Sequence, residues 1–254
     1  MNTPQPSFSV RVDVTNPGQF FACCGLLELA HRLWPGAQGW FQADLFNIAS
    51  DATDEQPLDT ILETLTRDPV QVDTARGDRG THPVGIGAFS LTIDWWIDPR
   101  GDKTALKLWA GQQTSLIIVE PLREALRECG AAAGRGLFEI ARPLTGRFGL
   151  DPRAAWRSLD VGFSPNEQGM QVATFPAVEL LAAVGLQRFR PVGASEGTFI
   201  YATWGIPLPP LLACAAAAGA LPAGRVRTYR FEITARGKYK GFSFATYEEM
   251  GHER

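Results

Sequence analysis

The first forty residues combine two periodicities, and this contrast limits how the chain can fold. Residues 8–14 (FSVRVDV) alternate apolar and polar side chains, which is the period of a half-buried strand. After an Asn-Pro-Gly turn, apolar residues recur at helical spacing over 19–34, until a Pro-Gly pair ends the pattern. The chain is therefore expected to begin with a strand, a tight turn and a buried helix, as one half of a ferredoxin-like unit does.

The rest of the chain mixes the two kinds of element without a strict alternation. Helices are expected over 57–68, 114–129 and 174–186, with a small-residue helix within 208–224. Strands are expected over 39–49, 88–97 and 199–208, with a pair over 225–249 that turns near Gly237. The predicted class is α+β, with a mixed or antiparallel sheet, packed helices and a ferredoxin-like core as one candidate arrangement. We expect a single globular domain over 1–254, with a subdivision near 130–136 as the alternative.

The composition is that of an ordinary folded protein, because 45% of its 254 residues are hydrophobic and 20% are charged. No run approaches the roughly eighteen apolar residues that a membrane helix needs. The N-terminus lacks the basic and apolar regions of an export signal, so we expect a cytoplasmic protein that binds no membrane. The four cysteines and three histidines lack metal-ligand spacing, so no metal and no cofactor are predicted.

The sequence contains none of the common catalytic motifs of hydrolases, nucleotide-binding enzymes or metalloproteases. His82 lies in a Gly-rich loop with Arg76 and Arg79, and a histidine with cationic neighbours can cleave RNA without a metal. A solvated loop histidine is the plainer interpretation. We therefore assign no catalytic residue and keep an endoribonuclease as the enzymatic alternative.

Charge is distributed unevenly along the chain. Residues 1–130 carry 10 basic and 17 acidic side chains, whereas residues 131–254 carry 14 and 10. Basic residues are concentrated in the predicted C-terminal hairpin, where aromatic residues including Phe231 and Phe242 lie between them. Cations with aromatic side chains suit phosphate pairing and base stacking. The alternative is a basic edge strand that only prevents aggregation. The hairpin residues predicted to bind nucleic acid are Arg225, Arg227, Tyr229, Arg230, Arg236, Lys238, Tyr239 and Lys240.

A second basic group consists of Arg135, Arg142, Arg147, Arg153 and Arg157, and it continues into a predicted helix. Asp151 can cap that helix, which places Arg153 and Arg157 at i and i+4 on one face. The two arginines suit a phosphate backbone, but pairing with Asp160 or Glu139 is an equal alternative.

The polar loop Ser164–Gly169 follows this helix. Without a histidine, lysine or cysteine beside it, Glu167 has no partner for acid-base chemistry. Asn166 and Gln168 supply donors and acceptors that suit a sugar-phosphate backbone or a partner subunit. A simple turn is the alternative.

Two long segments resemble a known family. The stretch NPGQFFACCGLLELAHRLWPGAQGWF, with FGLDPRAAWRSLDVGFSPNEQGMQVATFPAVELLAAVGLQRFRP, is similar to the short large-subunit-like proteins of type I-G (formerly I-U) CRISPR–Cas systems. The chain is shorter than typical large subunits, so the resemblance implies only part of their role.

The resemblance implies a non-catalytic subunit of a Cascade surveillance complex in antiviral defence. Such a subunit is expected to bind guide RNA, target DNA and other Cascade subunits, while a separate helicase-nuclease cuts the target. A purely structural adaptor between proteins is a third interpretation, in which the arginines meet acidic protein surfaces.

Overall fold

The fold is seen in a computed structural model. It describes residues 4–77, 80–87, 91–93, 108–109, 113–129, 131–154, 172–195, 197–221, 223–224, 226–236 and 239–248. Helices pack against antiparallel sheets, so the α+β prediction is confirmed.

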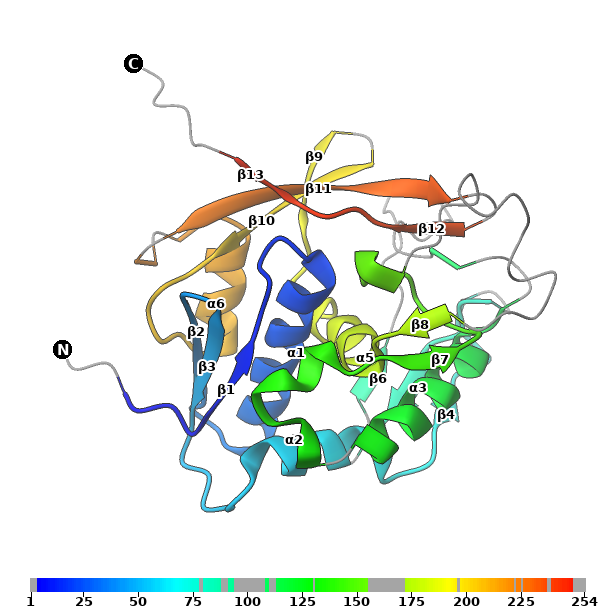
Figure 1. Cartoon of the computed structure of the whole chain (residues 1–254), viewed down its shortest axis with the longest axis horizontal. Helices are drawn as coiled ribbons and strands as arrows, with labels where there is room; N and C mark the ends of the chain where they lie inside the picture. The colour runs from blue at the N-terminus through cyan, green and yellow to red at the C-terminus, as the bar shows by residue number, and fades with distance from the viewer. Residues whose placement is uncertain are drawn as a thin grey trace.

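Two helices in contact form the centre of the fold (Figure 1). Helix α1 (Pro17–Leu33) is buried from Pro17 to Ala30, and α5 (Pro176–Gly185) is buried over its whole length. They touch through glycines: a Cβ on Gly25 would overlap the carbonyl oxygen of Leu181, and one on Gly185 would overlap that of Phe21. The two backbones therefore meet directly, at a distance that a larger residue would prevent.

Helix α1 begins two residues before the predicted start, because Pro17 and Gly18 of the predicted turn belong to its first turn. Asn16 is the N-cap, and its side-chain oxygen accepts a hydrogen bond of 3.2 Å from the Gln19 N–H. Pro17 occupies the first turn, where a missing N–H costs no helical hydrogen bond.

The N-terminal sheet lies beside α1. It consists of β1 (Phe8–Arg11), β2 (Gln38–Gln42) and β3 (Leu45–Ala49) in the order β1-β3-β2, with antiparallel neighbours. The single strand predicted over 39–49 is wrong, because the chain turns at Ala43, whose φ is 52°. This order is that of a split βαβ unit, the first half of a ferredoxin-like fold. A complete ferredoxin-like core is not confirmed.

The C-terminal sheet lies above the central helices in Figure 1, whereas the N-terminal sheet lies to the left of α1. Its order is β12-β11-β10-β9, and β13 also pairs with β11. The bounds are β9 (Val192–Ser195), β10 (Thr198–Thr203), β11 (Arg227–Arg236), β12 (Tyr239–Phe242) and β13 (Thr246–Glu248). The predicted hairpin is confirmed, since Arg236 pairs with Tyr239. Strands β12 and β13 lie along the same side of β11 and together form one interrupted edge, called here the β12–β13 edge.

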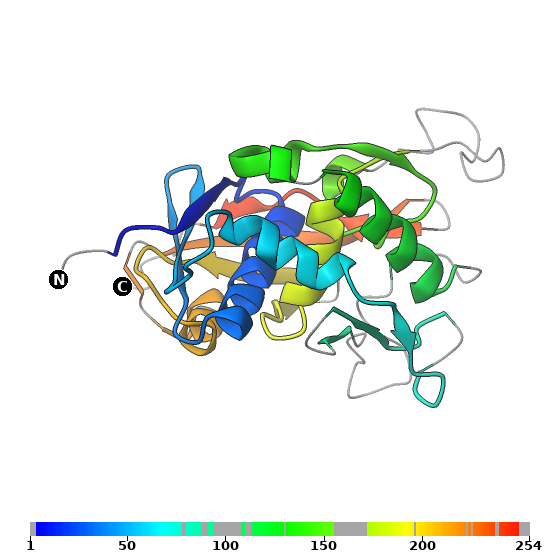
Figure 2. The ribbon, with the colours of Figure 1, turned by 90° about the horizontal axis from the view of Figure 1, so that it is seen from below.

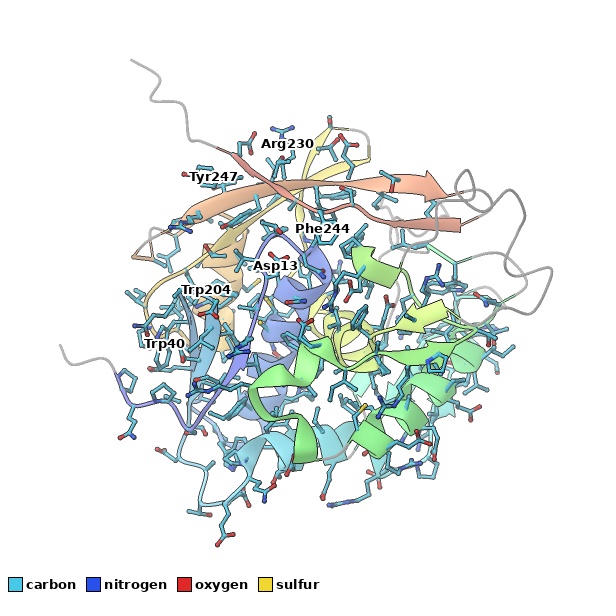
Figure 3. All side chains as sticks on the ribbon, in the orientation of Figure 1. Asp13, Trp40, Trp204, Arg230, Phe244 and Tyr247 are labelled. Atoms are coloured by element: carbon cyan, nitrogen blue, oxygen red, sulfur yellow. The ribbon has the colours of Figure 1, made fainter. Side chains whose placement is uncertain are left out.

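The two sheets are joined at a tryptophan. Gly39 of β2 pairs with Leu208, in the chain that follows β10. The buried Trp204 indole donates a hydrogen bond of 2.7 Å to the Gly39 carbonyl, and Trp40 lies nearby in Figure 3.

Smaller elements complete the opposite side of the molecule, where α2 lies across α1 in the view from below (Figure 2). The helical elements are α2 (Pro57–Thr66), α3 (Ser115–Cys129), η1 (Ala131–Glu139) and η2 (Pro152–Ala154). The strands form two small sheets, β4 (Gln71–Val72) with β5 (Val84–Ile86) and β6 (Leu91–Ile93), and β7 (Arg142–Leu144) with β8 (Val172–Thr174). The predicted helices over 57–68 and 114–129 are confirmed, and Pro121 lies inside α3.

The predicted small-residue helix is α6 (Pro210–Ala217). Ala213 and Ala216 are buried against the body, whereas Leu211 and Leu212 are exposed. Within the described residues, no helix has both the length and the apolar character to cross a membrane.

Candidate nucleic-acid interface

Strand β11 sends its aromatic side chains into the core. Tyr229 is only 4% exposed and stacks on Tyr201, with ring centroids 5.6 Å apart. Phe231 and Phe242 are also buried and pack edge to face, 4.7 Å apart. The alternation of a strand explains this, because every second residue of β11 faces α1. Tyr229 is therefore a core residue, and its predicted stacking on a base is corrected.

The cations of the hairpin lie apart along the sheet. Arg227 is exposed at the start of β11, and Lys240 is exposed on β12, opposite Ala235. The eight residue steps from Arg227 to Ala235 span roughly 26 Å of strand. Arg230, between them, is ion-paired with Glu248. These side chains would reach separate phosphates rather than surround one.

Two aromatic residues that the sequence did not single out are exposed at this edge. Phe244, between β12 and β13, is 49% exposed, and Tyr247 on β13 is 55% exposed. In Figure 3, Tyr247 lies at the sheet and Phe244 lies just below it, above Asp13 of the β1–α1 loop, whereas Arg230 lies above the sheet. Exposed aromatic rings beside cations are the combination that single-stranded nucleic acid requires for stacking and phosphate pairing. No sequence signal marks them, because exposure depends on where the strand breaks at 243–245.

The segment 148–151 is hydrogen-bonded to strand β12 of this edge. The Gly149 carbonyl accepts a hydrogen bond of 3.0 Å from the Phe242 N–H of β12. The carboxylate of Glu179, in the first turn of α5, accepts hydrogen bonds from the backbone N–H groups of all four residues of the segment, at 2.8 to 3.1 Å. Glu179 is fully buried and holds the segment in one conformation.

Burial sets the protonation of Glu179. It raises the pKa of this carboxyl to about 7, and the nearby charge of Asp151 adds to the rise. The N–H groups of Asp151 and Gly149 and the Arg147 guanidinium act in the opposite direction.

The same segment also contacts α1. The buried Asp151 carboxylate accepts a hydrogen bond of 3.0 Å from the side chain of Asn16, the cap of α1. A Cβ on Gly18 would overlap the Leu150 carbonyl, so the backbones touch here too. The segment is thus fixed at the N-terminal ends of both central helices, where negative side chains are favoured.

Arg153 stabilises the fold through ion pairs and is not a free cation at the surface. It is ion-paired with Asp151 at 2.7 Å and with Glu139 at 3.0 Å. Its guanidinium also lies 3.6 Å from the centroid of the Phe175 ring. Of the two alternatives for Arg153, pairing with Glu139 is the one observed, and the predicted phosphate contact is corrected for this side chain. Arg147 is half-buried beside Glu179.

Several predicted residues lie outside the described part of the chain: Arg157, Asn166, Gln168, Arg225 and Lys238. Arg236 and Tyr239 are described only as paired backbone positions in β11 and β12.

His82 is held by the backbone. Its Nδ1 lies 2.8 Å from the Arg76 carbonyl oxygen, so Nδ1 carries the hydrogen and Nε2 is the acceptor of the neutral ring. Arg79 lies outside the described residues. Over the described ranges, no three His, Cys, Asp or Glu side chains are grouped closely enough to hold a metal ion.

Comparisons of the chain with protein-family models, with curated proteins and with solved structures found no match.

Proposed function

We propose that this chain is a non-catalytic subunit of a type I CRISPR RNA-guided surveillance complex, and that it binds guide RNA or target DNA along the β12–β13 edge. The proposal joins the resemblance of two sequence segments to the surface chemistry of one strand edge.

The packing of the two segments supports the first part. Asn16 and Gly18 of the first segment contact Asp151 and Leu150 of the second. Gly25 of the first meets α5 of the second at the helix crossing. The described parts of the two segments therefore pack against each other in the core.

One observation carries the second part: the exposed Phe244 and Tyr247 on an edge flanked by Arg227 and Lys240. The Tyr247 ring packs edge to face on Tyr229, with centroids 6.1 Å apart, and still leaves the residue 55% exposed. Stacking of a base on such a ring contributes about 1–3 kcal/mol. The backing segment 148–151 makes this edge rigid, which reduces the ordering cost of binding.

Contact with other subunits is supported by the surface around α6. Residues 205–224 contain no charged side chain, and Ile206, Leu211 and Leu212 are exposed. An uncharged apolar surface suits a protein neighbour rather than a phosphate backbone.

The test is the affinity of the purified protein for a fluorescent single-stranded RNA, measured by anisotropy. Replacement of Phe244 and Tyr247 by Ala should weaken binding by at least tenfold, because two stacking contacts are lost. The matched control is Ile117→Ala, which removes a similarly exposed apolar side chain from α3 and should leave the affinity unchanged.

Equal affinities of the wild type and the double variant would overturn the interface. RNA that is cut during the incubation, with cutting lost in His82→Ala, would favour the ribonuclease instead. Absence of RNA binding, with co-purification of other Cascade subunits after nuclease treatment, would favour the structural adaptor.

A further inference from the structure

A second cationic site lies at the other end of the two central helices. The buried carboxylate of Glu28 on α1 accepts a hydrogen bond of 2.9 Å from Nε of Arg32, one turn further on. It also accepts one of 2.6 Å from Nε of Arg188, which follows α5. The Glu28 side chain is 6% exposed, whereas those of Arg32 and Arg188 are 34% and 41% exposed. One buried acid thus orients two arginines at the surface.

Both arginines retain outward donors. Arg32 uses only Nε, and Arg188 uses Nε with a longer bond of 3.3 Å from one terminal nitrogen. Within the described residues, the two terminal nitrogens of Arg32 and one of Arg188 have no protein acceptor. His31 adds a donor beside them, because its Nδ1 accepts the Gly36 N–H and its Nε2 carries the ring hydrogen when neutral.

The local charge is positive. Burial alone would raise the pKa of Glu28, but the hydrogen bonds from Arg188 and Arg32 outweigh it and lower this pKa, so the carboxylate stays ionised. Two guanidinium groups and one carboxylate leave a net charge of +1 at this site. Residues 26–36 and 186–195 contain no other acid, and Arg190 adds an exposed cation.

A structural role explains only part of this arrangement. Cations near the C-terminal ends of α1 and α5 are favoured by the helix dipoles. Two guanidinium groups fixed through their Nε edges, with terminal N–H groups left in solvent, are more than the dipoles require. Fixed, planar and outward-facing N–H groups match the oxygens of a phosphate.

We propose that Arg32 and Arg188, oriented by Glu28, form a phosphate-binding site. Its ligand is a phosphate group, either of a nucleic-acid backbone or of a free phosphate compound. Because Glu28 and Arg32 lie 11 and 15 residues after the first residue of α1, the site is about 20 Å along the helix from the end of α1 that meets the β12–β13 edge. It goes beyond the proposed function and does not depend on Phe244 or Tyr247.

Titration with inorganic phosphate, followed by NMR of the arginine Nε–H signals, tests the site directly. The Arg32 and Arg188 signals should shift with saturation. The double variant Arg32→Lys, Arg188→Lys keeps both charges and can still pair with Glu28, but it loses the planar fork. We expect it to bind phosphate about tenfold more weakly, since the paired charge-assisted hydrogen bonds of the planar guanidinium are lost.

The control is Arg67→Lys. Arg67 also pairs with a glutamate one turn away on a helix, but both partners are exposed and no second arginine is present in that pair. Its variant should bind phosphate like the wild type. Unshifted Arg32 and Arg188 signals, or equal weakening in both variants, would overturn the proposal.

Single-stranded RNA distinguishes the two sources of phosphate. A matching loss of RNA affinity in the double variant assigns the site to a nucleic-acid backbone. Phosphate binding without an RNA effect assigns it to a small phosphate compound. Either result stands whatever happens to RNA binding at Phe244 and Tyr247, so failure of one site is distinguishable from failure of the other.

Discussion

Two buried glutamates on the central helices differ in what surrounds them. Glu28 faces two arginine side chains, which lower its pKa, whereas Glu179 faces four backbone N–H groups and has a pKa raised by burial. A guanidinium carries a full charge and a peptide N–H only a partial one, so only the first fully offsets the loss of water.

This difference predicts how stability depends on pH. A carboxyl whose pKa rises from 4.5 when unfolded to about 7 when folded stabilises the fold most in its protonated form. Its contribution therefore decreases as the pH rises through 7. Between pH 5.5 and 8.5, the wild type should lose about 2 kcal/mol of unfolding free energy relative to Glu179→Gln, in urea titrations. Asp151 and Arg147 face this carboxyl and are present in both proteins.

Glu28→Gln is the control for that comparison. The lowered pKa of Glu28 means that its stabilisation is lost only as the pH falls through the acid range, so its difference from the wild type should be constant between pH 5.5 and 8.5. A difference between the wild type and Glu179→Gln that stays constant over this pH range would show that the four N–H groups outweigh burial.

The helix crossing gives a second prediction at the scale of single residues. In Gly25→Ala, the new methyl group would overlap the Leu181 carbonyl, so the helices must separate. We expect a loss of about 3 kcal/mol of unfolding free energy in chemical denaturation.

Gly193→Ala is the matched change in a different setting. Gly193 lies on the exposed strand β9, and no atom lies within 4 Å of the position that the new methyl group would occupy. It should unfold like the wild type. A Gly25→Ala protein of unchanged stability would contradict direct backbone contact between α1 and α5.

At the scale of elements, the hydrophobic pattern of neighbouring residues predicts those helices, strands and turns that local interactions determine. The strand that begins at Phe8, the helix after it and the hairpin near Gly237 depend on neighbouring residues, and the existence of each was predictable. The solvent exposure of the hairpin's aromatic side chains was not predictable from the sequence. Tyr229 and Tyr247 are opposite each other in the register of β11 and β13, yet one is buried and the other half open, because β13 is the edge strand.

The position of cations along β11 and β12 predicts the salt dependence of binding. Arg227→Ala and Lys240→Ala should each reduce the slope of log affinity against log salt by about 0.7, the effect of one lost contact to a single-stranded phosphate. Arg230→Ala should reduce it less, because Arg230 shares its charge with Glu248.

Arg67→Ala, on α2, should leave that slope unchanged, since Arg67 is exposed and paired with Glu63, away from the β12–β13 edge. Equal slopes for all four variants would mean that the RNA phosphates are contacted elsewhere.

At the scale of the whole molecule, the segment 148–151 connects the parts. It contacts the cap of α1, the first turn of α5 and strand β12. The contact between Asn16 and Asp151 joins positions 135 residues apart. No periodicity encodes such a pair, so the sequence indicated a turn at Asn16 and a helix cap at Asp151 without their contact. The burial of Glu179 could not be predicted either, because its hydrogen-bond partners lie about 30 residues away in the sequence.

Photo-cross-linking tests the central claim, that the β12–β13 edge binds nucleic acid, most directly. Single-stranded RNA containing 5-bromouridine is bound to the full chain, irradiated and digested, and the linked residues are identified by mass spectrometry. Cross-links to Phe244 or Tyr247, reduced by high salt, are the predicted result. Cross-links confined to α2 and α3, with Phe244 and Tyr247 unmodified, would contradict it.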